Sequence, residues 1–271
     1  MGSETAYSQR AIGASLGRPL SYVARVMNVI FLGATKGMGR ALARRLAQRG
    51  DRLVLLGRDR GDLEKSCGDL AADGAAPAGF ASCDLGARET FSPALDEALR
   101  LLGGRADLVV VTAGRFATQD KLEADSELCH DVLDVDFTGT VLFCEEARKR
   151  LLSQGGGTLC VFSSVAGERG RKPVVLYGAA KAGLTRYLEG LDHRYRSEGL
   201  KVVTVKPGFV RTGLTAGLKS PPFAGEPDDV AARVLRAIDR GSPVVYAPFA
   251  WGPIMAVIRG LPRFVMRRIG F

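Results

Sequence analysis

Seven short apolar runs, which alternate along the chain with longer amphipathic segments, constrain the fold more than any other feature. The runs lack polar alternation, which is typical of strands buried on both faces of a sheet. Strands that alternate with helical segments form parallel sheets covered by helices. The predicted strands are residues 28–32, 52–56, 78–82, 107–111, 157–163, 201–206 and 244–246. The predicted helices are residues 40–49, 59–72, 91–102, 127–152, 176–198 and 227–239.

The series runs without a linker or an internal repeat, and 271 residues suit one large domain. We therefore predict the α/β class, with a single doubly wound Rossmann-type domain over residues 27–248 and a mostly parallel seven-stranded sheet. Residues 1–26 lack an apolar core and are predicted to be a flexible leader, either an artefact preceding a start at Met27 or a disordered arm. Residues 249–271 form a basic amphipathic C-terminal tail.

The composition argues against several other classes of protein. The net charge is +9, but no zinc-finger or RNA-recognition pattern accompanies it, so no nucleic-acid partner is expected. The five cysteines lack C-x-x-C spacing and the two histidines lie far apart, which argues against a disulfide framework and against a metal site. No apolar stretch reaches the roughly 20 residues that span a bilayer. A reducing, cytoplasmic location fits these observations.

A glycine-rich turn follows the first predicted strand and opens the first predicted helix. Glycines permit a tight turn and allow backbone N–H groups to approach a pyrophosphate at the positive end of a helix. An ordinary strand-to-helix turn also contains glycine, but the position after the first strand of a βαβ unit favours a dinucleotide site. The residues of this turn are Gly33, Thr35, Lys36, Gly37, Met38 and Gly39.

The end of the second predicted strand bears on the choice between NAD and NADP. NAD-binding domains usually place an acid there to hold the ribose 2′-hydroxyl. This chain has Leu56, Gly57 and Arg58 at that point, and Lys36 stands in the glycine turn. Each cation by itself is also typical of a solvated surface, but two cations without an acid suit a 2′-phosphate. The predicted cofactor is therefore NADP(H).

A tyrosine and a lysine at the start of the helix at 176–198 form a candidate catalytic pair. Tyr177 and Lys181 are four residues apart, so they share one helical face. An ammonium near a phenol lowers the tyrosine pKa from its ordinary value of about 10, which suits proton exchange with an alkoxide. Ser164 lies 13 residues before Tyr177, at the carboxyl end of a strand, where open α/β sheets bind ligands.

The motifs, taken as an ordered series, resemble those of the short-chain dehydrogenase/reductase family. The resemblance implies hydride transfer between NADP(H) and a ketone or the matching secondary alcohol, and assembly as a homodimer or homotetramer. It spans roughly residues 27–247 and rests on Gly33-x-x-x-Gly37-x-Gly39, Cys83-Asp84-Leu85, Thr112-Ala113-Gly114, Ser164, Tyr177-x-x-x-Lys181 and Pro207-Gly208-Phe-Val-Arg-Thr212.

The resemblance implies a role for each matched position. Tyr177 would donate the proton to the carbonyl oxygen, Lys181 would hold the nicotinamide ribose and lower the Tyr177 pKa, and Ser164 would orient the substrate oxygen. The implied catalytic residues are Ser164, Tyr177, Lys181 and Asp136. The implied cofactor-binding residues are Gly33, Thr35, Lys36, Gly37, Met38, Gly39, Arg58, Asp84, Leu85, Ala113, Gly114, Tyr177, Lys181, Pro207, Gly208, Val210 and Thr212.

The chain departs from the family pattern at two positions. Thr112 stands where the family often has asparagine, a mild change. Asp136 stands where the family usually has an asparagine that helps to hold a water behind the lysine. An ionised Asp136 accepts hydrogen bonds but donates none, and it can pair with Lys181. We expect activity to survive; the alternative is a catalytically weak nucleotide-binding sensor or scaffold of the same fold.

Two segments bear on the substrate. Residues 214–224 are either an apolar flap over the site or a loop without a substrate role. In the tail, Arg259, Arg263 and Arg267 recur every four residues, beside many apolar side chains. This pattern predicts a helix, started or kinked by proline, that contacts an anionic membrane peripherally or packs on the body or a second subunit. The tail also resembles, loosely, those of family members acting on lipid-linked keto-sugars or long-chain keto-bases, which implies a hydrophobic or lipid-linked ketone.

Overall fold

Seven parallel strands form one sheet in the computed structural model, which describes residues 26–73, 77–221 and 223–269. The spatial order β3-β2-β1-β4-β5-β6-β7 reverses direction between β1 and β4, and this switch point is where doubly wound sheets bind ligands. The predicted fold class is confirmed. The strands are β1 Asn28–Leu32, β2 Arg52–Gly57, β3 Gly79–Ser82, β4 Leu108–Val111, β5 Gly157–Phe162, β6 Leu200–Pro207 and β7 Val244–Ala247.

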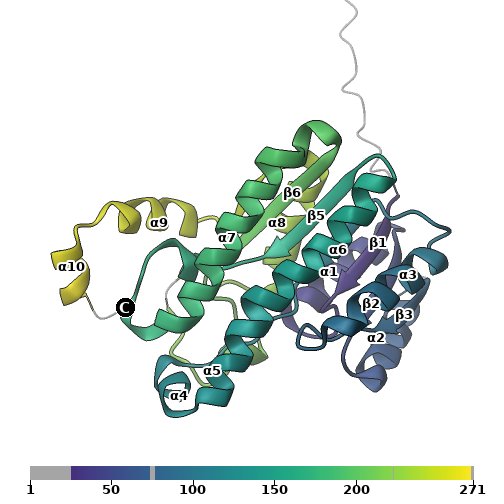
Figure 1. Cartoon of the computed structure of the whole chain (residues 1–271). Helices are drawn as coiled ribbons and strands as arrows, with labels where there is room; N and C mark the ends of the chain where they lie inside the picture. Colours follow the sequence, from purple (N-terminus) through teal and green to yellow (C-terminus); the bar gives the residue numbers. More distant parts are fainter. Residues whose placement is uncertain (1–25, 74–76, 222, 270–271) are drawn as a thin grey trace, which may run out of the picture.

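Helices cover both faces of the sheet (Figure 1). Helices α1, α2 and α8 pack on one face, and α3, α6 and α7 pack on the other. The predicted leader, apart from Val26, lies outside the described residues. The helices are α1 Gly37–Gln48, α2 Arg60–Ala72, α3 Phe91–Leu101, α4 Gln119–Ala124, α5 Ser126–Leu133, α6 Thr140–Ser153, α7 Val175–Tyr195, α8 Pro227–Arg240, α9 Trp251–Gly260 and α10 Arg263–Arg268.

Strand β1 shows why the apolar runs carry no polar alternation. Its successive side chains point to opposite faces of the sheet. Val29 and Phe31 join the core under α1, α2 and α8, whereas Ile30 and Leu32 join the core under α3, α6 and α7. All four are at most 1% exposed, so neither face tolerates a polar side chain.

The helix predicted over residues 127–152 is interrupted, which corrects that expectation. Helix α5 ends at Leu133, a π-helical turn spans Asp134–Gly139, and α6 follows. The backbone of Gly139 approaches the β3–α3 connection so closely that a Cβ there would lie 2.1 Å from the Leu85 carbonyl oxygen. Single π turns within helices often mark functional sites, and this one carries Asp136.

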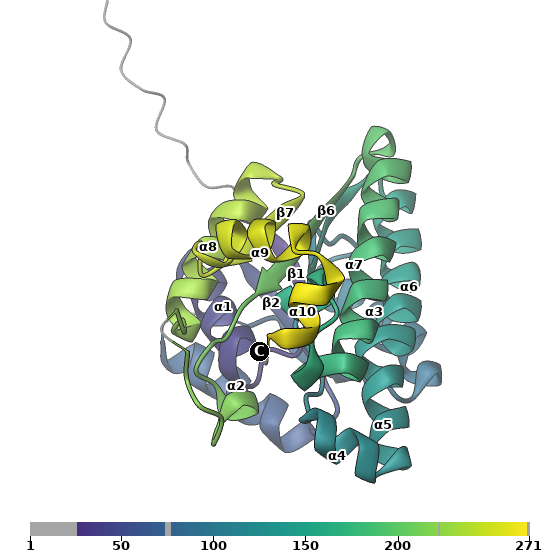
Figure 2. The ribbon, with the colours of Figure 1, turned by 90° about the vertical axis from the view of Figure 1, so that its left-hand side faces the viewer.

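The tail is two helices rather than one, so its arginines do not form a stripe on a single helix. Helix α9 carries Arg259, and α10 carries Arg263 and Arg267. The break falls at Leu261–Pro262, where both residues are extended, because proline lacks the N–H that a continuous helix needs. Figure 2 views the molecule from the side on which α9 and α10 lie. Among the described helices none is long and apolar enough to cross a membrane.

Candidate active site

The glycine turn between β1 and α1 is packed against the end of β4. Gly33 has a φ of +96°, and a Cβ there would lie 2.4 Å from the Ala113 backbone nitrogen. A Cβ on Gly39 would lie 2.1 Å from the Gly33 carbonyl oxygen. The Thr112 hydroxyl donates to that same oxygen at 2.8 Å. Gly33 and Gly39 are therefore required by these close backbone contacts. Thr112, which departs from the family pattern, connects the end of β4 to the turn through its hydrogen bond.

A cavity of about 380 Å³ lies at the carboxyl ends of β1, β2, β3 and β4, directly above this turn. Such a position suits a dinucleotide, whose pyrophosphate lies at the N-terminus of the first helix. Most of the predicted cofactor-binding residues line it, namely Gly33, Thr35, Lys36, Gly37, Met38, Gly39, Arg58, Asp84, Leu85, Ala113, Gly114 and Thr212.

Besides Tyr177 and Lys181, three predicted cofactor-binding residues lie outside the cavity lining. Pro207 ends β6 and pairs with Ala247 of β7. Gly208 lies so close to the indole of Trp251 that a Cβ would be 2.1 Å from its Nε1. Val210 is buried and forms a bridge with Gly225. Their role toward the cofactor stays a prediction.

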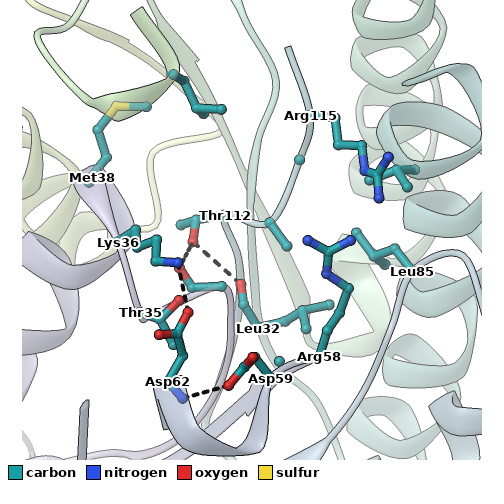
Figure 3. A pocket seen from close by; sticks show the side chains of 18 of the residues that line it. Leu32, Thr35, Lys36, Met38, Arg58, Asp59, Asp62, Leu85, Thr112 and Arg115 are labelled. Atoms are coloured by element: carbon teal, nitrogen blue, oxygen red, sulfur yellow. Dashed lines mark hydrogen bonds and ion pairs between the residues drawn. The ribbon is translucent and has the colours of Figure 1, made fainter. Parts of the chain in front are cut away.

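The two predicted phosphate-binding cations differ in their surroundings. Lys36 is 80% exposed, and its Nζ forms an ion pair with Asp62 Oδ2 at 2.7 Å. Within the described residues Arg58 forms no ion pair, although it lines the cavity. Figure 3 shows the guanidinium groups of Arg58 and Arg115 on the same side of the cavity, away from Lys36. Arg58 is therefore the cation that is available to a bound anion.

Three charged residues that line the cavity, Asp59, Asp62 and Arg115, were not predicted from the sequence. Asp59 caps α2 by accepting a hydrogen bond from the Asp62 backbone nitrogen at 2.8 Å, a helix-start signal that was present in the sequence. Arg115 follows the Thr-Ala-Gly motif directly, and its Nη1 pairs with Asp131 at 2.5 Å. The acid that seemed absent after β2 is thus present but is engaged as a helix cap.

The predicted catalytic residues converge where β5 meets α7. Ser164 follows β5, and its Oγ accepts a hydrogen bond from the Ala166 backbone nitrogen at 3.0 Å. Tyr177 lies in the first turn of α7 and packs edge-to-face on Phe116, with ring centroids 5.1 Å apart. Lys181 Nζ is 5.7 Å from the Tyr177 ring centroid. These side chains adjoin the cavity, because a Cβ on its lining residue Gly114 would lie 3.6 Å from that Nζ.

The electrostatics of Tyr177 are a balance of opposing effects. Burial raises the pKa of Tyr177 above its ordinary value, while the Lys181 ammonium lowers the pKa and the Asp136 carboxylate raises it further. A hydrogen bond with Ser164 also lowers the pKa. The net direction is upward, so the lysine acts as expected but does not by itself decide the protonation of the phenol.

Asp136 pairs with Lys181 inside the protein. Lys181 Nζ lies 3.0 Å from Asp136 Oδ1, and their side chains are 5% and 0% exposed. The Arg115 backbone nitrogen donates to the same oxygen at 3.2 Å. Burial raises the pKa of Asp136 although Lys181 opposes this. Burial lowers the pKa of Lys181, but Asp136 and Tyr177 together raise it above its ordinary value. Asp136 Oδ2 is buried without a hydrogen-bond partner among the described residues.

The predicted flap and tail are joined to each other near this site. The Trp251 indole of α9 donates to the Phe223 carbonyl oxygen at 3.2 Å. Leu214, at the start of the flap, lines the cofactor cavity, whereas Pro222 lies outside the described residues. Met255 of α9 packs with Val165, which follows Ser164 directly. The tail therefore borders the catalytic turn, and the flap borders the cofactor cavity.

A switch-point cavity with a glycine turn, beside a tyrosine–lysine pair, defines an oxidoreductase of the Rossmann type that uses a nicotinamide cofactor. Comparison with known families then names the group. The sequence pattern described as short chain dehydrogenase matches residues 27–222, and the chain belongs to this family.

Several known proteins are similar to this chain over most of its length. An uncharacterised oxidoreductase of Mycobacterium tuberculosis is 33% identical over 241 residues, covering 89% of this chain and 96% of its own length. Carbonyl reductase family member 4 of Danio rerio is 31% identical, covering 86% and 96%. The solved structure of an actinorhodin polyketide ketoreductase with NADPH superposes with a TM-score of 0.74 at 22% identity, covering 82% and 95%. At that identity the structural likeness supports the fold alone.

Proposed function

We propose that this protein reduces a ketone to a secondary alcohol with NADPH, and that Tyr177 donates the proton. The observation that carries the proposal is that Ser164, Tyr177 and Lys181 lie beside a cavity at the switch point of the sheet. Arg58, without an acidic partner among the described residues, supports NADP(H) over NAD(H). One relative is named as a carbonyl reductase, which agrees with the reduction of a ketone.

The cofactor fits the residues present, with the glycine turn for the pyrophosphate, Arg58 for a 2′-phosphate and Lys181 for the nicotinamide ribose. When bound, it supplies the hydride. Ser164 Oγ accepts from Ala166, and its O–H, which hydrogen-bonds Tyr177, would donate to the carbonyl of a bound substrate. Tyr177 then transfers its proton to the developing alkoxide, and the Lys181 ammonium stabilises the phenolate left behind.

The raised pKa of Tyr177 keeps the phenol protonated at neutral pH but also makes it a weaker acid. A phenol whose pKa lies above its ordinary value is protonated at neutral pH, which is the form that donates a proton. The alternative role as a catalytically weak sensor or scaffold rests on Asp136, because its carboxylate opposes the effect of Lys181 on Tyr177. Tight cofactor binding without turnover on any ketone would favour that alternative.

The substrate class in this proposal is a hydrophobic or lipid-linked ketone. It is supported by exposed apolar side chains on the flap and tail, with Leu214 and Phe223 each 54% exposed and Phe264 62% exposed. Arg263 and Arg267 accompany them on α10, which supports peripheral contact with an anionic membrane. A homodimer or homotetramer also stays a prediction.

The first experiment is a fluorescence titration with NADPH and NADH on the wild type, Arg58→Gln and Lys36→Gln. We expect the wild type to bind NADPH more tightly, and Arg58→Gln to lose most of that preference. Lys36→Gln is the matched control and should change the preference less, since Asp62 already pairs with Lys36. Equal affinity of the wild type for both nucleotides would contradict NADP(H) specificity. A panel of ketones with increasing apolar bulk then tests turnover.

A further inference from the structure

Glu168 connects the catalytic turn to the C-terminal tail through a buried carboxylate. It ends the short 3-10 turn Val165–Glu168, which begins directly after Ser164. Its Oε1 accepts from Lys206 Nζ of β6 at 2.5 Å. Its Oε2 accepts from the Tyr246 hydroxyl of β7 at 3.0 Å and pairs with Arg259 of α9 at 3.0 Å. The sheet therefore holds both oxygens, and Oε2 is shared between the sheet and the tail.

The burial of this cluster makes its geometry specific. The side chains of Glu168 and Lys206 are 4% and 8% exposed, whereas that of Arg259 is 49% exposed. A buried charge is tolerated only with a partner of opposite sign and further hydrogen bonds. Lys206 thus holds the carboxylate in place, and the carboxylate presents its second oxygen to the arginine that arrives from the tail.

Neighbouring contacts link the same two segments. Arg169, which follows Glu168, donates from Nη2 to the Leu261 carbonyl oxygen at 2.7 Å, at the end of α9. Val165 is buried together with Met255 and Ile258 of α9. The proposed chemistry of Ser164, Tyr177 and Lys181 uses none of these groups. Their common effect is to hold α9 against the turn that carries Ser164.

We propose that Glu168 is a positioning residue that fixes α9 as a stationary wall of the substrate site. A ketone large enough to extend from Ser164 along Val165 then meets α9, whereas a small ketone does not reach it. The kinetic part of this inference rests on the proposed ketone reductase function. The structural part, the attachment of α9, is independent of any reaction.

The test measures hydrogen exchange of the α9 amides in the full-length wild type, Glu168→Gln and Arg259→Gln. Asp51→Asn is the matched control, because Asp51 is an equally buried carboxylate paired with Arg49 at 2.6 Å, at the amino end of β2. We expect α9 exchange to accelerate at least about tenfold in Glu168→Gln, less in Arg259→Gln, and not selectively in Asp51→Asn. Unchanged exchange in Glu168→Gln would overturn the inference. An effect in Glu168→Gln but none in Arg259→Gln would also overturn it, since Glu168 would then only balance Lys206.

Steady-state kinetics with a small and a bulky ketone give the second readout. In Glu168→Gln we expect the KM of the bulky ketone to rise about tenfold, with kcat changing less than about threefold and the small ketone nearly unaffected. An equal loss for both ketones would overturn the role in substrate positioning. If no ketone is reduced by the wild type, the proposed function fails, while the exchange measurement still decides whether Glu168 attaches the tail.

Discussion

At the residue scale, Asp136 places a carboxylate at the most enclosed point of the site. A buried acid beside the catalytic lysine has two opposite effects on Tyr177: its own charge raises the pKa of the phenol, and it keeps Lys181 charged, which lowers it. The backbone of Gly114 packs closely against the Asp136–Lys181 ion pair. A Cβ on Gly114 would lie only 2.6 Å from Asp136 Oδ1, so this position requires glycine. The departure from the family pattern therefore tunes the proposed proton donor.

Replacing Tyr177 by phenylalanine tests the proposed proton donor directly. The ring keeps its edge-to-face contact with Phe116, but the proton donor is lost. We expect kcat for ketone reduction to fall at least about 100-fold, with NADPH affinity nearly unchanged. Tyr187→Phe on the same helix is the control, because the hydroxyl of Tyr187 donates to Glu145 away from the site. A loss of tenfold or less in Tyr177→Phe would refute the assignment.

The pH dependence of alcohol oxidation tests Asp136. Oxidation needs the phenolate of Tyr177, whose pKa is raised, so the rate should increase with pH towards and beyond the ordinary value of about 10. Asp136→Asn removes the negative charge that raises the pKa of Tyr177, so the rise of the oxidation rate with pH should occur at lower pH. The measurement is kcat/KM for oxidation against pH in both proteins. If the rise instead moves to higher pH in Asp136→Asn, then Asp136 acts mainly by keeping Lys181 charged.

At the scale of single elements, the turn between β1 and α1 tolerates little change. Gly39→Ala would place a methyl group 2.1 Å from the Gly33 carbonyl oxygen and 2.5 Å from Thr112 Oγ1. We expect it to abolish measurable NADPH binding and to lower the stability against urea, because the clash involves backbone atoms. Gly68→Ala in α2 meets no atom within 4 Å and should stabilise the protein by up to about 1 kcal/mol. Unimpaired NADPH binding by Gly39→Ala would contradict the geometry described.

Element boundaries show where sequence periodicity suffices. The strand of residues 28–32 was predicted with its observed bounds, because four consecutive apolar residues, Val29 to Leu32, follow Asn28 and precede a glycine turn. The π-helical turn at Asp134–Gly139 was not predicted, since one extra residue in a turn leaves the apolar pattern of the flanking helices almost unchanged. The break at Leu261–Pro262 was signalled by the proline, but the direction of α10 was not.

At the scale of the whole molecule, exposed apolar side chains gather on the flap and the tail. Cosedimentation with phosphatidylglycerol vesicles tests the proposed membrane contact. We expect the wild type to bind these vesicles more than neutral ones and to release them at high salt, because arginines accompany the apolar groups. The double variant Val257→Ser, Phe264→Ser should bind at least about tenfold less, as it removes side chains that are 67% and 62% exposed.

Leu142→Ser supplies the matched control for that measurement. Leu142 is 36% exposed on α6, outside the flap and the tail, so its loss should leave vesicle binding unchanged. Equal binding of neutral and anionic vesicles, or equal losses in the two variants, would argue against a membrane surface formed by the tail.

The strands, the glycine turn and the tyrosine–lysine pair could be predicted from the sequence, because each depends on residues close together in the chain. Apolar periodicity specifies strands and helices, and a spacing of four residues places Tyr177 and Lys181 on one face. Only the tertiary structure decided that Asp62 pairs with Lys36 and that Glu168 joins the catalytic turn to the tail. These pairings join residues far apart in the sequence, and their strength depends on burial, which local patterns do not encode.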